Sequence, residues 1–389
     1  MAAVNSHLLD TGTPPIPEAK AWARRYDGSR GPLIDLSQAV PGYPAHPDLL
    51  ARIAAAAGEA ATASYGPIGG DTALVDTYAA HVSEFYGAPV SPAEISLTAG
   101  CNLAFFVAMM ATAKAGDAVL LPSPWYFNHE MALRMSGIET RPLPCRPEAG
   151  FVPDPDDAER LLDGRVRAIV LVTPNNPTGA VYPPGTIARF AELCRRKRLW
   201  LILDETYRDF LPGEGDVPHA LFSDAGWRDV LIGLYSFSKS YCVPGHRLGA
   251  IIAAASLQAE IGKILDTVQI CPPRVAQGAV AWGVGALADW REANRLEIAG
   301  RAAAFTAAMG QAPDWRVDSV GAYFAYVAHP FAGVPAPVVA ERLAVERGVL
   351  GLPGGYFGPG QDGHLRIAFA NADAAALAQL PARLAGFGI

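Results

Sequence analysis

The sequence lacks the features that are typical of membrane proteins, secreted proteins and metal-binding proteins. No run of about 18 apolar residues occurs, so no transmembrane helix is expected. The N-terminus has no basic stretch followed by an apolar one, so no secretory signal is expected. The eight histidines form no H-E-x-x-H or similar cluster, so the sequence gives no indication of a metal site.

Cysteines are few, and acidic residues outnumber basic ones. The five cysteines occur singly, without a C-x-x-C pair, which indicates reduced thiols in a cytoplasmic protein. A formal net charge of −7 offers no basic surface for nucleic acid and no polybasic membrane anchor. The 389 residues instead have a globular balance, with 51% hydrophobic and 18% charged residues, and are numerous enough for two domains.

Strand and helix patterns alternate along the middle of the chain. Short apolar runs separated by helical stretches predict an α/β fold, with a mainly parallel sheet sandwiched by helices. The predicted strands are residues 95–98, 118–121, 168–172, 199–203, 230–235 and 248–252. The predicted helices include residues 71–85, 103–112, 186–197 and 257–268.

The sequence pattern changes near residue 285. An Ala-rich, charged stretch over 286–309 predicts one long helix, and short strand patterns follow it. We therefore expect a large domain over 46–285 and a smaller α+β domain over 286–389. The smaller unit would include the N-terminal arm 1–45, whose many Pro and Gly residues predict little regular structure.

Polar side chains directly follow two of the predicted strands. Asp204 and Tyr207 lie in D-E-T-Y after one strand, and Asn176 lies in T-P-N-N-P-T-G after another. Ligands of open α/β sheets bind beyond the carboxyl ends of the strands. Each motif alone also has a plain structural explanation, because an aspartate can cap a helix and Pro with Gly can form an ordinary turn.

Two further strand ends could bind an anion. The first predicted strand ends in A-G-C-N, so Cys101 and Asn102 would begin a helix whose N–H groups attract phosphate. Many such turns contain glycine, and the G-x-x-x-x-G-K pattern is missing. Another strand ends in S-F-S-K, with Ser236 and Lys239, and Arg247 follows the lysine by eight positions. A lysine here can simply be solvated, but its hydroxyl, arginine and aromatic neighbours favour a recessed anion site.

Together these motifs resemble the class I/II aminotransferases, the fold-type-I pyridoxal-phosphate enzymes related to aspartate aminotransferase. S-F-S-K, N-P-T-G and D-E-x-Y occur in the family's order, and the similar series extends from Pro41-Gly42 to Arg366. The resemblance implies a large pyridoxal 5'-phosphate domain and a smaller α+β domain. It also implies a ping-pong transfer of the amino group of an L-amino acid to a 2-oxo acid.

The resemblance implies how the cofactor would be held. Lys239 would bind it as a Schiff base and shuttle a proton, and Asp204 would face the pyridine nitrogen. Tyr126 would stack on the ring, with Trp125 as the competing choice.

The phosphate would bind to the N–H groups of Cys101 and Asn102, together with Ser236 and Arg247. Tyr65 is similar to a tyrosine that reaches the partner subunit's phosphate site. That similarity implies a homodimer with shared active sites.

Substrate contacts follow from the same resemblance. Arg366 would bind the substrate α-carboxylate through two parallel hydrogen bonds, with Gly42 and Asn176 near the same group. Asn176 and Tyr207 would also donate to the cofactor's phenolic oxygen. No residue is assigned to the substrate side chain. The candidates are Tyr43, Gln269, Arg274 and Tyr323, and packing is the simpler explanation for each of them.

Other functions remain as alternatives. A β-elimination lyase or a cyclising synthase would use the same cofactor, and Arg366 does not separate them because all bind α-carboxylates. A ligand-sensing regulator would need a DNA-binding module, for which residues 1–45 are too short and too rich in proline. A catalytically silent relative is disfavoured because Lys239, Asp204 and Arg366 are all present.

Overall fold

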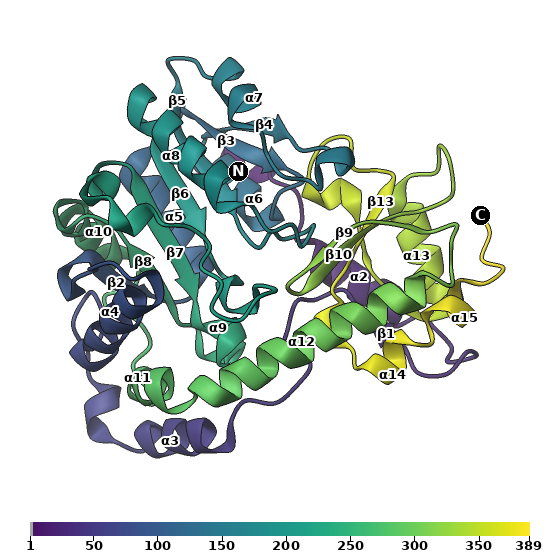
Figure 1. The fold of residues 1–389 in the computed structure, drawn as a ribbon, viewed down its shortest axis with the longest axis horizontal. Coiled ribbons are helices and arrows are strands. Elements are labelled where there is room, and N and C mark those ends of the chain that lie inside the picture. Colours follow the sequence, from purple (N-terminus) through teal and green to yellow (C-terminus); the bar gives the residue numbers. More distant parts are fainter. Residues whose placement is uncertain (1–2) are drawn as a thin grey trace.

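Two large β-sheets connected by a long helix, together with a small two-stranded sheet, organise residues 3–389, the part of the chain that the computed structural model describes (Figure 1). The larger sheet has seven strands in the order β2-β8-β7-β6-β5-β3-β4. These are β2 (Ile95–Thr98), β3 (Ala118–Ser123), β4 (Glu139–Pro144), β5 (Val166–Val172), β6 (Trp200–Asp204), β7 (Leu231–Ser236) and β8 (Gly249–Ile252). Only β8 runs antiparallel to its neighbours, so the expected mainly parallel sheet is confirmed.

Helices cover both faces of this sheet, as expected for strands that are buried on both sides. Alternate residues of β5 contribute to two separate cores, since Ala168 and Val170 pack with α5 and α10 whereas Ile169 and Leu171 pack with α4, α8 and α11. The helices around the sheet are α3 (Pro47–Ala57), α4 (Thr72–Tyr86), α5 (Cys101–Thr112), α6 (Phe127–Met135), α7 (Pro155–Arg160), α8 (Pro184–Lys197), α9 (Phe237–Ser240), α10 (Ala255–Val268) and α11 (Gln277–Ala286).

The C-terminal part forms a four-stranded antiparallel sheet in the order β12-β13-β10-β9. Its strands are β9 (Arg316–Gly321), β10 (Phe324–Ala328), β12 (Leu352–Pro353) and β13 (His364–Ile367). The long helix α12 (Ala288–Met309) leads to it from α11 (Figure 1). The remaining helices are α13 (Ala336–Arg347), α14 (Ala374–Leu377) and α15 (Leu380–Leu384).

The N-terminal arm is more regular than we expected from its composition. It forms α1 (Ser6–Leu9), α2 (Pro15–Ala23) and β1 (Ile34–Asp35), which pairs in parallel with β11 (Val349–Leu350). Proline favours the first turn of a helix, where its missing N–H has no partner to lose, so the prolines of the arm start α2 rather than break it. Of the expected arm, residues 1–2 lie outside the described part of the chain.

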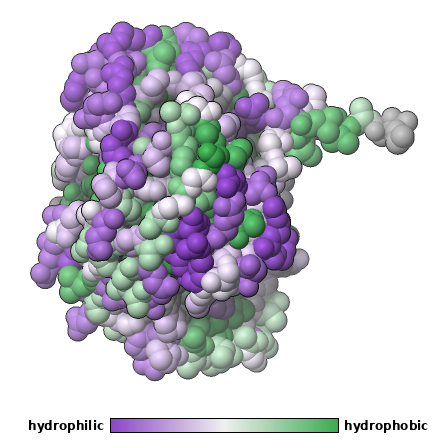
Figure 2. All heavy atoms as spheres, turned by 90° about the vertical axis from the view of Figure 1, so that its right-hand side faces the viewer, coloured by the Kyte–Doolittle hydropathy of each residue, from purple (hydrophilic) through white to green (hydrophobic). Residues whose placement is uncertain are grey.

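The arm connects the two sheets. α1 contacts α6 beside the larger sheet, and α2 contacts α13 and β12 beside the smaller one. Within residues 3–389, every helix is too short or too polar to cross a lipid bilayer. On the face shown in Figure 2, hydrophilic and hydrophobic residues are interspersed.

Candidate active site

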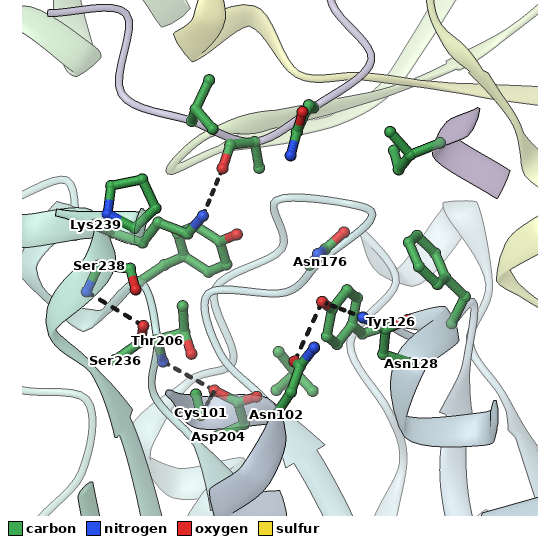
Figure 3. Close-up of a pocket in the computed structure, with 18 of the residues that line it drawn as sticks. Cys101, Asn102, Tyr126, Asn128, Asn176, Asp204, Thr206, Ser236, Ser238 and Lys239 are labelled. Atoms are coloured by element: carbon green, nitrogen blue, oxygen red, sulfur yellow. Dashed lines mark hydrogen bonds between the residues drawn. The ribbon is translucent and has the colours of Figure 1, made fainter. Parts of the chain in front are cut away.

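A cavity of about 450 Å³ lies where the carboxyl ends of β5, β6 and β7 meet the start of α5 and strand β13. Figure 3 shows polar side chains that face this space from the ends of β5, β6 and β7 and from the start of α5. It brings together most of the residues singled out in the sequence, namely Cys101, Asn102, Tyr126, Asn176, Asp204, Tyr207, Ser236, Lys239, Arg247 and Arg366. Residues more than two hundred positions apart thus share one site.

Asp204 is a buried carboxylate at the end of β6. Its Oδ1 accepts a hydrogen bond from the backbone N–H of Thr206 at 3.0 Å, and its Oδ2 lies 3.2 Å from Nε2 of His129. Cys101 Sγ donates to Oδ1 at 3.8 Å. Burial alone would raise the pKa of Asp204, but the hydrogen bonds from His129 and Thr206 outweigh it and lower the pKa. The carboxylate is therefore ionised at neutral pH.

Lys239 lies on α9, a single helical turn that begins after Ser236. The Ser236 side chain accepts from the N–H of Ser238, which fixes the start of this turn. The Lys239 amine donates to the carbonyl of Ala39 (Figure 3). Burial lowers the pKa of Lys239 to about 8, with the nearby charges of Arg366 and Arg247 acting in the same direction. The site thus favours a neutral, nucleophilic amine more than water does.

An anion-binding corner is formed at the N-terminus of α5. Gly100 precedes the helix with a φ of 87° and supplies no side-chain cap, so the N–H groups of Cys101 and Asn102 have no acceptor within residues 3–389. A Cβ on Gly100 would overlap Nη2 of Arg247, which lies against this turn. The hydroxyl of Ser238, in the same lining, is buried without a partner among residues 3–389. Backbone donors, a hydroxyl and a guanidinium therefore converge, as a bound phosphate requires.

Arg366 lies on β13 and is only 2% exposed. Its Nη1 donates to Oδ1 of Asn176 at 3.1 Å and its Nη2 donates to the carbonyl of Ser37. Its Nε is buried and finds no partner in the described part of the chain. Burial lowers the pKa of Arg366 to about 10, so the guanidinium still carries its charge at neutral pH. This residue can bind a carboxylate that enters the cavity.

Of the two aromatic candidates for the ring-stacking position, Tyr126 lines the cavity. Its hydroxyl donates to Oδ1 of Asn102 at 3.3 Å and accepts from Nδ2 of Asn128 at 2.8 Å (Figure 3). Trp125 instead packs against the core on the α5 side of the sheet and beside Gly358.

Two of the expected site residues do not line the cavity. The N–H of Gly42 donates to the carbonyl of Ala370 at 3.1 Å, and the chain approaches the cavity a few residues earlier, at Ala39. Tyr65 is 79% exposed on the surface of this chain.

The four candidates for the substrate side chain also lie outside the lining. Gln269 holds the backbone next to β2, accepting from the N–H of Ala99 at 3.0 Å. Arg274 pairs with Asp71. Tyr323 is buried in the core and the partly buried Tyr43 packs against it, and neither hydroxyl has a partner within the described residues.

Several site residues were missed by the sequence analysis. His129 lies on α6, three positions after Tyr126. We did not predict this helix, so the sequence did not indicate that the two side chains lie close together. Pro14, Ile16, Gln38 and other arm residues line the cavity although the arm was expected to be irregular. No local pattern reveals them, because they reach the site through tertiary packing.

The chain is similar to known proteins along its whole length. The family described as "Aminotransferase class I and II" matches residues 31–384. Arginine–pyruvate transaminase AruH of Pseudomonas aeruginosa is 30% identical over 305 residues, covering 78% of this chain and 77% of the relative. Valine–pyruvate aminotransferase of Mycobacterium tuberculosis is 31% identical over 276 residues, 69% of each chain.

Solved structures agree with the architecture. Aspartate aminotransferase from Thermus thermophilus with maleate superposes with a TM-score of 0.89 at 24% identity, covering 99% of both chains. An aminotransferase from Mycobacterium tuberculosis gives a TM-score of 0.89 at 25% identity, covering 99% of this chain and 98% of the other. The fold is therefore that of aspartate aminotransferase, and the chain belongs to the class I and II aminotransferases, enzymes that transfer amino groups.

Proposed function

We propose that this aminotransferase binds pyridoxal 5'-phosphate covalently through Lys239 and transfers the amino group of an L-amino acid to a 2-oxo acid in a ping-pong reaction. One observation carries the proposal. A lysine with a lowered pKa shares a cavity with an ionised buried carboxylate, with the anion corner that contains Arg247, and with the buried Arg366.

The residues fit the cofactor. The amine of Lys239 matches its aldehyde, and the corner of Cys101, Asn102, Ser236 and Arg247 matches its phosphate. The Ser238 hydroxyl, which has no partner within residues 3–389, and the close approach of the Arg247 guanidinium to Gly100 support a bound anion there. Asp204 would hold the pyridine nitrogen in its protonated form, Asn176 and Tyr207 would contact the phenolic oxygen, and Tyr126 would cover the ring.

When bound, pyridoxal phosphate supplies an electron sink for a carbanion at the substrate Cα. Lys239 would take the proton from Cα, because a pKa of about 8 leaves a useful fraction of neutral amine near neutral pH. A positioned base of this kind contributes about 10²–10⁴-fold to a rate.

Arg366 would orient the substrate. Two hydrogen bonds from one guanidinium fix the plane of the α-carboxylate, and with it the Cα bond that breaks. Asn176 supports this role by bonding Nη1 of Arg366 at 3.1 Å. Family membership supports amino transfer over the lyase and synthase alternatives.

We further propose a homodimer in which Tyr65 reaches the partner's phosphate site, and the exposure of its ring supports this. The domain division at residues 45/46 and 285/286 is likewise a proposal, supported by the start of α12 at Ala288. Five free cysteines support a reducing, cytoplasmic environment.

Borohydride reduction of the cofactor-loaded enzyme, followed by peptide mapping, tests the proposal. We expect the label on Lys239 and none in a Lys239→Ala variant, which should also lose nearly all turnover. Lys263→Ala is the matched control, because Lys263 is exposed on α10, away from the cavity lining, and pairs with Glu260. A labelled Lys239→Ala protein, or one with normal turnover, would remove Lys239 from the mechanism.

A further inference from the structure

Every charged side chain that lines the cavity already has a task in the proposed function. Among residues 3–389, the cationic lining consists of Lys239, Arg247 and Arg366, assigned to the cofactor aldehyde, the phosphate and the α-carboxylate. The acidic lining in the same range is Asp204 alone, and its oxygens are occupied by Thr206, His129 and Cys101. The lining contributed by residues 3–389 therefore leaves no counter-ion of either sign for a substrate side chain.

The lining contributed by the N-terminal arm and the start of α6 is neutral. Pro14, Ile16, Val40 and Phe127 offer apolar surface, whereas Gln38 and Asn128 offer amide groups. These residues have no role in holding the cofactor or the α-carboxylate. They are therefore available to the substrate side chain.

In the proposed homodimer, the partner subunit would bring to the site the residues that surround its Tyr65. The cation beside Tyr65 is Arg274, whose Nη1 donates to the carbonyl of Ser64 at 3.1 Å. Arg274 also pairs with Asp71 through Nε at 3.1 Å, so its charge is already neutralised. It holds the loop that carries Tyr65 and has no free charge to offer a second carboxylate.

We propose that the substrates of this enzyme carry neutral side chains, so that donor and acceptor are monocarboxylic amino and 2-oxo acids rather than dicarboxylic or basic ones. The inference rests on the proposed function and deepens it. A charged group that leaves water without gaining a counter-ion is bound poorly, whereas apolar and amide side chains match this lining.

Substrates of similar length test the proposal directly. We expect kcat/KM for L-methionine and L-glutamine to exceed that for L-glutamate and L-lysine by about 100-fold or more, since an unpaired buried charge costs more than an unpaired neutral group. Pyruvate should likewise be a better acceptor than 2-oxoglutarate. Equal values for glutamate and glutamine would overturn the inference and leave the transaminase function intact. Failure of all four amino acids to convert the cofactor would overturn the proposed function itself.

Equilibrium binding gives a readout that is independent of turnover. Calorimetric titration of the cofactor-loaded enzyme with 4-methylpentanoate and with glutarate compares a monocarboxylate with a dicarboxylate of similar length. We expect glutarate to bind at least about 10-fold more weakly, because its second carboxylate finds no counter-ion. Tighter binding of glutarate would overturn the proposal.

A variant can supply the missing charge. Gln38→Lys adds a cation to the neutral lining, and we expect it to raise the glutamate-to-glutamine ratio of kcat/KM by about 10-fold. Gln38→Met, of similar length and no charge, should show no comparable gain in kcat/KM for glutamate. An unchanged ratio in Gln38→Lys would overturn the assignment of this lining to the substrate side chain.

Discussion

Nε2 of His129 lies 3.2 Å from Oδ2 of Asp204, and both side chains are buried. The ring of Phe105 stacks on the imidazole at 3.9 Å between centroids, which fixes the orientation of the histidine. A carboxylate with such a partner stays ionised where burial alone would protonate it. The charge of Asp204 therefore depends on a residue outside the cavity lining.

Replacing His129 should weaken the charge on Asp204. In His129→Ala the pKa of Asp204 should rise, because burial then acts with less opposition. Charge-assisted hydrogen bonds contribute about 1.5–3 kcal/mol, so we expect kcat/KM to fall by about 10–100-fold. The pH–rate profile should also show its acidic limb at higher pH. His129→Gln, which keeps a donor, should recover part of the loss; identical profiles in wild type and His129→Ala would contradict this role.

The lowered pKa of Lys239 should make the stability of the cofactor-free protein depend on pH. Between about 8 and the ordinary value of 10.5, the unfolded chain binds a proton at this residue that the folded chain does not. The free energy of unfolding should therefore rise with pH in this window, relative to a Lys239→Met variant. Denaturant titrations at pH 8 and pH 10 measure the difference. Lys263→Met should behave as the wild type, and a parallel response of all three proteins would contradict the lowered pKa.

Gly100→Ala should damage the anion corner in a specific way. The new methyl would overlap Nη2 of Arg247, so the guanidinium must move away from the N-terminus of α5. We expect the Kd for pyridoxal phosphate to rise by about 10-fold or more, from the loss of a charge-assisted contact. Gly116→Ala is the matched control, because Gly116 has a φ of 89° and nothing within 4 Å of an added Cβ. Both variants share the cost of a left-handed backbone, and only Gly100→Ala should lose cofactor affinity.

Tyr65→Phe tests the shared active site. The hydroxyl is exposed in one chain, so its removal should leave thermal stability unchanged. If it binds the phosphate in a partner subunit, cofactor dissociation should accelerate by about 10-fold. Dialysis of the cofactor-loaded enzyme, followed by absorbance, measures how long the cofactor is retained. Unchanged retention would argue against this intersubunit contact.

Most strands of the large sheet could be predicted because their apolar runs are buried on both faces, as in β5. Strand β4 was missed because it lies at the edge of the sheet and buries only Leu143. The polar residues after β5, β6 and β7 could be placed at one site because parallel strands end on one edge.

Contacts between distant segments could not be predicted in the same way. Arg366 donates to the carbonyl of Ser37, and Lys239 donates to that of Ala39, although neither acceptor lies in a sequence motif. Backbone carbonyls are present at every residue, so only the folded arrangement selects which of them faces the site.

The bond from Arg366 to Asn176 joins the C-terminal sheet to the loop that follows β5. A carboxylate held by this arginine would therefore be gripped at the junction of the two halves of the molecule. Ligand affinity would then add to the cohesion between them, by about 2.7 kcal/mol at a concentration one hundred times Kd. The melting temperature of the whole chain should therefore rise when a carboxylate ligand binds to Arg366.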